Sequence, residues 1–171
     1  MIIKLLGMGI IMLSSSLMGI CFAECMASRE KELINLLDAA EMISNELSYS
    51  MSPIKDIVCS IAPMVKGVCA EMFSVFKEQI EKGKTASEAW SYALDKKAAA
   101  MSLKKEDASY LKMLSTMFDA YEIDEQKRRI NELKLRLSSL ADNAQKAKNK
   151  NSKIAKMLGV YGGVLLCVII F

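Results

Sequence analysis

The chain of 171 residues contains no histidine, only two prolines and eight glycines, and 6% aromatic residues. Without histidine there is no Ser-His-Asp or Cys-His nucleophile system, no HExxH zinc site and no side chain that ordinarily titrates near neutral pH. So little proline and glycine excludes collagen, low-complexity disorder and a sandwich of many short strands. No P-loop, dinucleotide-binding, nucleophile-elbow or paired CxxC motif occurs. These absences predict a protein that is not an enzyme and holds no cofactor or metal.

Hydrophobic residues make up 52% of the chain, and the excess lies at its two ends. Lys4 is the only charged residue between positions 2 and 23, a run of about the ~20 residues that cross a bilayer. The C-terminal run from Met157 to Phe171 carries no charge, and a helix that starts at Ile154 with Lys156 reaching to the interface approaches the same length. The sequence predicts transmembrane helices over residues 1–23 and 154–171.

The N-terminal run has an alternative interpretation as a cleaved signal peptide. Cys21-Phe22-Ala23 offers small residues at the positions that a signal peptidase reads, and cleavage near Ala23 would give a secreted helical binding module. The single lysine before the apolar run and the length of that run favour an uncleaved membrane helix.

Basic residues near the second apolar run predict its orientation. Five lysines precede it within a short stretch (Lys146, Lys148, Lys150, Lys153 and Lys156), and none follows it. Because positively charged flanks stay in the cytoplasm, the middle of the chain is expected to be cytoplasmic. The five cysteines agree with a reducing compartment, since their number is odd and their spacing fits no metal site.

The sequence predicts a bundle of helices over residues 24–122. Ser52 as N-cap and Pro53 as first helical residue are expected to begin a short helix, Pro63 to break or kink that helix, and Gly83 to end the next one. Thr85 to Glu88 form a capping box at the start of a further helix. Apolar residues recur at spacings of three and four on the expected core faces, which include Leu33, Leu36, Leu37, Ala40, Ile43, Leu47, Met72, Phe73, Phe76, Trp90, Leu94, Leu111, Leu114 and Phe118.

Residues 123–153 are predicted to form one long basic amphipathic helix that packs on the bundle. Its expected apolar stripe is Ile123, Ile130, Leu133, Leu137, Leu140 and Ala144. Residues 24–122 hold 12 basic and 16 acidic side chains, whereas residues 123–156 hold 10 basic and 4 acidic ones. The basic face therefore suits anionic lipid headgroups, a partner protein or the acidic bundle.

Reactive side chains give little sign of chemistry. Carboxylates are expected at helix starts or on solvated helix surfaces, as in the pairs Glu30/Glu32, Asp38/Glu41 and Glu106/Asp107. Cys59 and Cys69 are expected as small apolar core residues. Lys127-Arg128-Arg129 lacks the interleaved aromatic residues of a nucleic-acid surface, so no nucleic-acid partner is expected. A membrane-bound enzyme using lysine or carboxylate chemistry stays an alternative, and its sign would be a deep pocket lined by polar residues.

Gly159 and Gly163 stand four residues apart in the C-terminal apolar run. Small residues at this spacing share one helix face and permit close packing against another membrane helix. The expected partner is either the first membrane helix, through Gly7, Ser15 and Gly19, or a second copy of the chain.

The order and spacing of several short stretches resemble those of the stage III sporulation protein AB family of endospore-forming bacteria over essentially the whole chain. They are KLLG at residues 4–7, ELSYSMSPI at 46–54, SEAW at 87–90, Gln126 with the basic helix after it, and MLGVYGGVLL at 157–166.

This resemblance implies a function that the residues alone do not supply. Family members belong to the channel between mother cell and forespore, and their cytoplasmic domain is similar to that of type II secretion and type IV pilus inner-membrane platform proteins. The implied chain is a non-enzymatic platform subunit on the mother-cell side of the outer forespore membrane. The implied partners are a hexameric ATPase similar to stage III sporulation protein AA, other channel subunits and membrane lipids.

Overall fold

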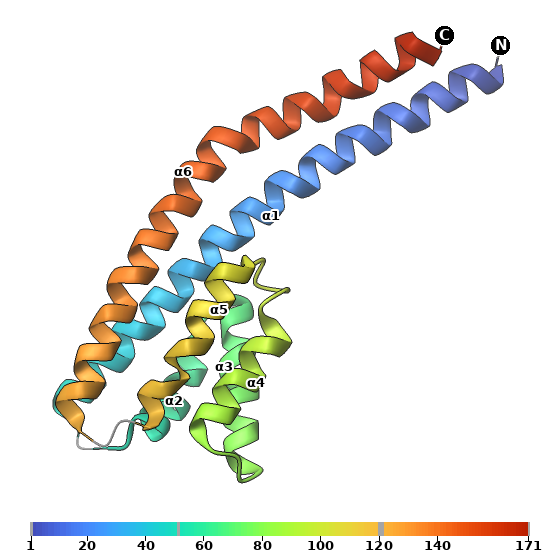
Figure 1. Ribbon diagram of the computed structural model, residues 1–171. Coiled ribbons are helices and arrows are strands. Elements are labelled where there is room, and N and C mark those ends of the chain that lie inside the picture. Colours follow the sequence, from blue (N-terminus) through green and yellow to red (C-terminus); the bar gives the residue numbers. More distant parts are fainter. Residues whose placement is uncertain (1, 51, 120–121, 171) are drawn as a thin grey trace. The chain divides into compact units, whose positions relative to one another are not determined.

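The computed structural model describes the backbone of residues 2–50, 52–119 and 122–170, and within them the surroundings of all side chains except those of residues 2–6, 8, 114, 156, 159–160, 163 and 165–170. This part of the chain is all-helical, which confirms the predicted class (Figure 1). Its elements are α1 (Ile2–Tyr49), α2 (Ile54–Ile61), the 3-10 helix η1 (Ala62–Met64), α3 (Gly67–Glu81), α4 (Ala86–Lys97), α5 (Lys105–Met113), the 3-10 helix η2 (Leu114–Asp119) and α6 (Ile123–Ile170).

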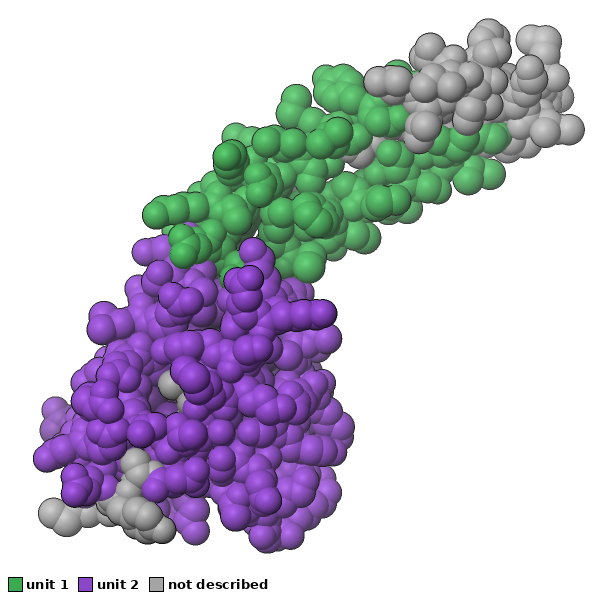
Figure 2. Space-filling model, in the orientation of Figure 1, with its two compact units in different colours: residues 1–30, 143–171 green, residues 31–142 purple. Residues whose placement is uncertain are grey.

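The chain forms two compact units (Figure 2). Unit 1 consists of Met1–Glu30 and Asn143–Phe171, and its described residues belong to the first part of α1 and the last part of α6. Unit 2 is Lys31–Asp142 and contains all the shorter helices together with the remaining parts of α1 and α6.

The two long helices are uninterrupted because their sequences contain no helix breaker at the places where they pass between units. No proline or glycine occurs between Gly19 and the end of α1, so the apolar N-terminal run and the following amphipathic stretch form one helix. Likewise, the predicted basic helix from residue 123 is part of α6, which begins at Ile123 and continues into the C-terminal apolar run.

The breaks between the short helices follow the local signals with one correction. Pro63 lies in η1 and ends α2, Gly83 adopts φ +85° after α3, and the Thr85–Glu88 capping box is complete at the start of α4. Ser52 was predicted to cap α2, which is wrong. Pro53 is itself the N-cap, with extended ψ of 140°, and helical geometry begins only at Ile54.

Four aromatic rings form the centre of unit 2. Phe73 and Phe76 on α3 each meet Trp90 on α4 edge-on, with ring centroids 5.9 and 6.2 Å apart. Phe118 of η2 stacks on Phe76 at 5.4 Å. The indole Nε1 of Trp90 donates a hydrogen bond of 2.8 Å to the carbonyl oxygen of Leu111, so this buried polar group is satisfied.

The long helices complete this core. One very small cavity is bordered by residues of α1, α3, α4, α5, η2 and α6, namely Leu36, Ala40, Ile43, Phe73, Trp90, Leu111, Met117, Leu133 and Leu137. The stripe predicted on α6 is buried from Ile130 onward, whereas Ile123 at its start is 43% exposed. That part of the prediction is wrong, because Ile123 is the first residue of α6.

Candidate functional site: a paired-helix segment and a buried carboxylate junction

Within unit 1, α1 and α6 lie side by side and run antiparallel (Figure 1). A Cβ atom placed on Gly162 would lie 3.8 Å from the Ser15 hydroxyl oxygen. Further along, the Lys148 Nζ donates to Glu30 Oε2 at 2.6 Å. Residue numbers thus fall along α6 as they rise along α1, which fixes the register of the pair.

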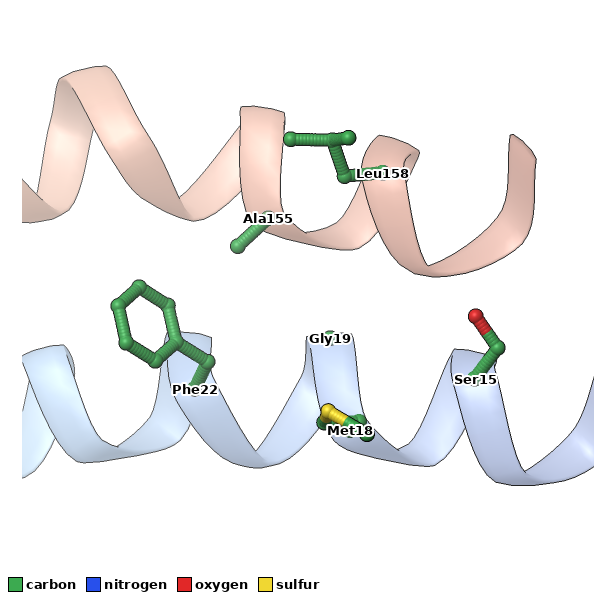
Figure 3. A pocket seen from close by; sticks show the side chains of 6 residues that line it. All are labelled: Ser15, Met18, Gly19, Phe22, Ala155 and Leu158. Atoms are coloured by element: carbon green, nitrogen blue, oxygen red, sulfur yellow. The ribbon is translucent and has the colours of Figure 1, made fainter. Parts of the chain in front are cut away.

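Between these two contacts the helices leave an apolar groove of about 330 Å³. Six residues line it: Ser15, Met18, Gly19, Phe22, Ala155 and Leu158. In Figure 3, Phe22 and Ser15 project from α1 toward α6, and Ala155 projects toward α1. Gly19 and Ala155 have little or no side chain, which leaves the space open between them. The lining suits an apolar occupant and offers no cluster of convergent polar groups for catalysis.

The structure tests only part of the glycine prediction. Gly159 and Gly163 lie outside the residues whose surroundings are described, so their predicted role stays a prediction. On α1, Gly19 is buried at the α6 interface, whereas a Cβ on Gly7 would meet nothing within 4 Å.

Gly162 was not predicted as a residue that contacts α1. The available signal was a spacing of seven residues that runs from Lys148 through Ala155 to Gly162 and places all three on one face.

The carboxylate of Glu30 is buried, which contradicts the predicted solvated surface. Its side chain is only 10% exposed, and its partner Lys148 is 39% exposed. The prediction failed because Glu30 lies on the face of α1 that packs against α6, where Lys148 supplies the opposite charge.

Glu32 is also buried, inside unit 2, and it caps the start of α3 from a distant helix. Its Oε2 accepts a 2.9 Å hydrogen bond from the backbone N–H of Cys69 and a 3.3 Å bond from the Asn35 side-chain amide. A carboxylate at a helix N-terminus satisfies a donor that has no partner within the helix and matches the helix dipole. The prediction that Glu32 is solvated is therefore wrong too. It is also wrong for Asp107, which is buried and whose Oδ2 accepts a 3.0 Å hydrogen bond from the backbone N–H of Lys104.

Gly67 makes this junction possible. It adopts φ +69°, a conformation that side chains disfavour, and a Cβ there would lie 2.4 Å from Glu32 Oε1. Glycine is the residue that lets the chain pass so close to the carboxylate. The junction is filled by the protein's own groups, so it is a structural contact and not a binding pocket.

The cysteines of unit 2 are held in unreactive forms. Burial, with a smaller contribution from the nearby Glu32 carboxylate, raises the pKa of the Cys69 thiol far above its usual range. Burial and then Asp56 raise the pKa of the half-buried Cys59. Since the thiolate is the nucleophile, neither cysteine is suited to covalent catalysis. The structure confirms Cys69 as a core residue, whereas Cys59 is only partly buried.

In the basic cluster at the start of α6, Arg128 and Arg129 pair with neighbouring glutamates. Glu125 Oε1 accepts from Arg128 and Arg129, each at 2.7 Å, and Arg128 also pairs with Glu132. These hydrogen bonds, from Arg128 first and then Arg129, lower the pKa of Glu125 to about 2. Arg129 further donates to the Thr116 hydroxyl of η2 at 2.7 Å, and this hydrogen bond links the N-terminal part of α6 to η2.

Among the residues that the structure describes, no group of three histidine, cysteine or carboxylate side chains is arranged to hold a metal ion. Within the same residues, one helix is long and apolar enough to cross a membrane, and it is α1 from Gly9 onward. Most of the C-terminal apolar run lies outside the residues whose surroundings are described, so its predicted span stays a prediction.

Comparison with known proteins gives consistent results at the levels of family, sequence and fold. The profile of the stage III sporulation protein AB family matches residues 4–171. Stage III sporulation protein AB of Bacillus subtilis (strain 168) is 27% identical over 169 residues, which are 98% of this chain and 99% of that protein. A solved structure of stage III sporulation protein AB matches in fold with a TM-score of 0.65 and 24% identity, over 72% of this chain and 98% of that one. The chain belongs to the stage III sporulation protein AB family.

Proposed function

We propose that this protein is a non-enzymatic membrane platform subunit of the mother cell–forespore channel complex and couples a cytoplasmic ATPase to the membrane machinery. The partner would be a hexameric ATPase similar to stage III sporulation protein AA, together with other channel subunits and membrane lipids, and no nucleic acid. Family membership over residues 4–171 supports the role in sporulation.

The observation that carries the coupling role is the continuity of α1 and α6. Each helix supplies core residues to unit 2, such as Leu36 and Leu137, and extends without a break into its apolar end. A load applied to the helical bundle would thereby reach the membrane segments through backbone hydrogen bonds rather than through a flexible linker. We expect residues 1–23 and 154–171 in the membrane and residues 24–153 in the mother-cell cytoplasm.

Two features favour an uncleaved N-terminus over the secreted alternative. Ala23, the residue before the potential cleavage point, is buried within α1, and the helix continues through it to Tyr49. Residues on both sides of it contact α6, as Phe22 does at the groove and Glu30 does through Lys148.

Co-purification from membranes of sporulating cells tests this function. The full-length chain, extracted in mild detergent, is expected to retain the ATPase. A matched variant with Leu137→Ala, which loosens the core, should retain less than the surface control Leu135→Ala. Absence of the ATPase from the wild-type complex would contradict the coupling role.

A separate measurement tests topology. Protease added to right-side-out vesicles should leave the middle of the chain intact, whereas inverted vesicles should lose it. A mature chain that begins at Glu24, or digestion from the outside, would support the secreted alternative instead.

A further inference from the structure

Three lysines on α6 form a basic stripe in unit 1. Lys146, Lys150 and Lys153 are exposed, and none makes an ion pair with any described residue. Their spacings of four and three place them within about 60° of one another on a helix with 3.6 residues per turn. They share one face of α6, which we call the lysine face.

The lysine face points away from α1. Lys148 lies on the opposite side of α6, where it binds Glu30, and Ala155 and Gly162 follow on that side against α1. Toward the C-terminus the lysine face continues as the exposed side chains Met157, Tyr161 and Val164. Basic groups are thus followed along one helix face by uncovered apolar groups.

The register of α1 against α6 indicates how far the three lysines of the lysine face lie from the hydrocarbon layer of the expected membrane. Phe22 and Ala155 line the same groove. Ala23, where the apolar run of α1 ends, therefore lies at about the same height along the helix pair as Ile154 on α6. At 1.5 Å per residue, Lys150 lies about 6 Å and Lys146 about 12 Å along the axis from Ile154. A headgroup layer is about 5 to 8 Å thick, so Lys153 and Lys150 fall within it. Lys146 lies beyond the layer but within the Debye length of about 8 Å from its outer edge.

We propose that the lysine face, together with Met157, Tyr161 and Val164, binds anionic phospholipids of the leaflet next to the bundle. The ammonium groups contact the phosphate oxygens, and the acyl chains lie along the apolar side chains. Residues 24–30 and 143–155 contain five basic and two acidic residues, so this level of the chain is cationic. An acidic protein surface would match the lysines but would leave the adjoining apolar residues uncovered.

This inference rests on the proposed membrane insertion, and the experiment separates the two. Full-length protein in detergent is titrated with phosphatidylglycerol or with phosphatidylcholine of the same acyl chains, and bound lipids are counted by native mass spectrometry. The variants are Lys146→Gln/Lys150→Gln/Lys153→Gln, the same triple change to arginine, and a control triple of exposed lysines in unit 2, Lys55→Gln/Lys66→Gln/Lys105→Gln. Carbonate extraction of native membranes reports insertion independently.

We expect the wild type to prefer phosphatidylglycerol by about tenfold or more, since each lysine near the surface contributes about a fivefold preference. The glutamine triple should lose most of this preference while it stays membrane-integral, whereas the arginine triple and the control triple should keep it. The lipid assignment would be overturned if the membrane-integral wild type showed no preference for phosphatidylglycerol. It would also be overturned if the glutamine triple kept that preference. Loss of a co-purifying protein with an unchanged lipid ratio would overturn it in favour of an acidic partner. Extraction of the wild type by carbonate would contradict the membrane anchor itself.

Discussion

The ammonium nitrogen of Lys148 lies 2.6 Å from Oε2 of Glu30, which joins two residues that are 118 positions apart in the chain. Both side chains lie on the facing sides of α1 and α6, so the ion pair marks the register of the two helices together with the approach of Gly162 to Ser15. Glu30 is almost fully covered, so its charge depends on Lys148 more than an exposed carboxylate would.

Lys148→Met is therefore expected to destabilise the helix pair by about 1 to 3 kcal/mol, because it leaves a buried carboxylate without its partner. Adding Glu30→Gln should recover part of this loss, since the unpaired charge is then gone. Lys150→Met, which removes an exposed lysine without an ion pair among the described residues, serves as the matched control. Thermal unfolding of the full-length chain in detergent measures all four proteins. Equal loss in Lys150→Met and Lys148→Met would show that the ion pair has no special role.

Gly67→Ala should destabilise unit 2 more than Gly83→Ala. Both glycines have positive φ, so each substitution carries a backbone cost of about 1 to 2 kcal/mol. Only at Gly67 does the new Cβ also collide with Glu32, whereas at Gly83 it would meet nothing within 4 Å. The difference between the variants thus measures the steric contact at the buried carboxylate. Denaturant unfolding followed by fluorescence of Trp90, the sole tryptophan, reports it, and equal midpoints would contradict the Glu32 junction.

Leu137→Ala is expected to cost about 2 to 5 kcal/mol of unfolding free energy, as large-to-small changes in a packed core do. Leu137 is 1% exposed, whereas Leu135, two residues earlier on the same helix, is 75% exposed. Leu135→Ala should therefore leave stability almost unchanged. Similar unfolding of both variants would mean that this stripe of α6 does not face the bundle, and an oligomeric coiled coil would become the better explanation.

Glu125 gives the start of α6 a defined dependence on pH. Its pKa in the folded chain is about 2, below the ~4.3 of an unperturbed glutamate, so its contribution to stability is complete above that ordinary value and is lost as the pH falls toward about 2. Glu125→Gln should therefore be less stable than the wild type at neutral pH.

The difference between these two proteins should shrink between pH ~4 and ~2, because the unfolded chain then binds the proton more readily. Asp124→Asn, which removes an exposed carboxylate from the same helical turn, serves as the control for charge near the helix start. Denaturant unfolding across this range is the measurement, and a constant difference would show that the arginine contacts to Glu125 do not form.

Local signals in the sequence predicted most of the helices and their breaks. Pro63, Gly83 and the Thr85–Glu88 box act through their own backbone or through residues three positions away, so their effects can be predicted without knowledge of the fold. The long helix from Ile123 was predictable for the same reason, because an unbroken stretch of helix formers needs no distant partner.

The buried carboxylates were not predictable in this way. Glu30 and Glu32 are two residues apart on α1, and each is covered by a segment distant in sequence, Lys148 for one and the start of α3 for the other. Composition alone places carboxylates at the surface, and only the packing of helices decides otherwise. Gly67 carried a weak signal of its own, since glycine at the start of a helix often marks a close approach of the backbone.

Disulfide cross-linking in native membranes measures whether the two ends of one chain pair as antiparallel membrane helices. In a chain whose native cysteines are replaced, Ser15→Cys is combined with Gly162→Cys, because a Cβ at 162 lies 3.8 Å from the Ser15 hydroxyl oxygen. The matched control combines Gly162→Cys with Leu13→Cys, since Leu13 is exposed. We expect an efficient disulfide within one chain for the first pair and little for the control. Links only between chains, or equal yields from both pairs, would contradict this pairing.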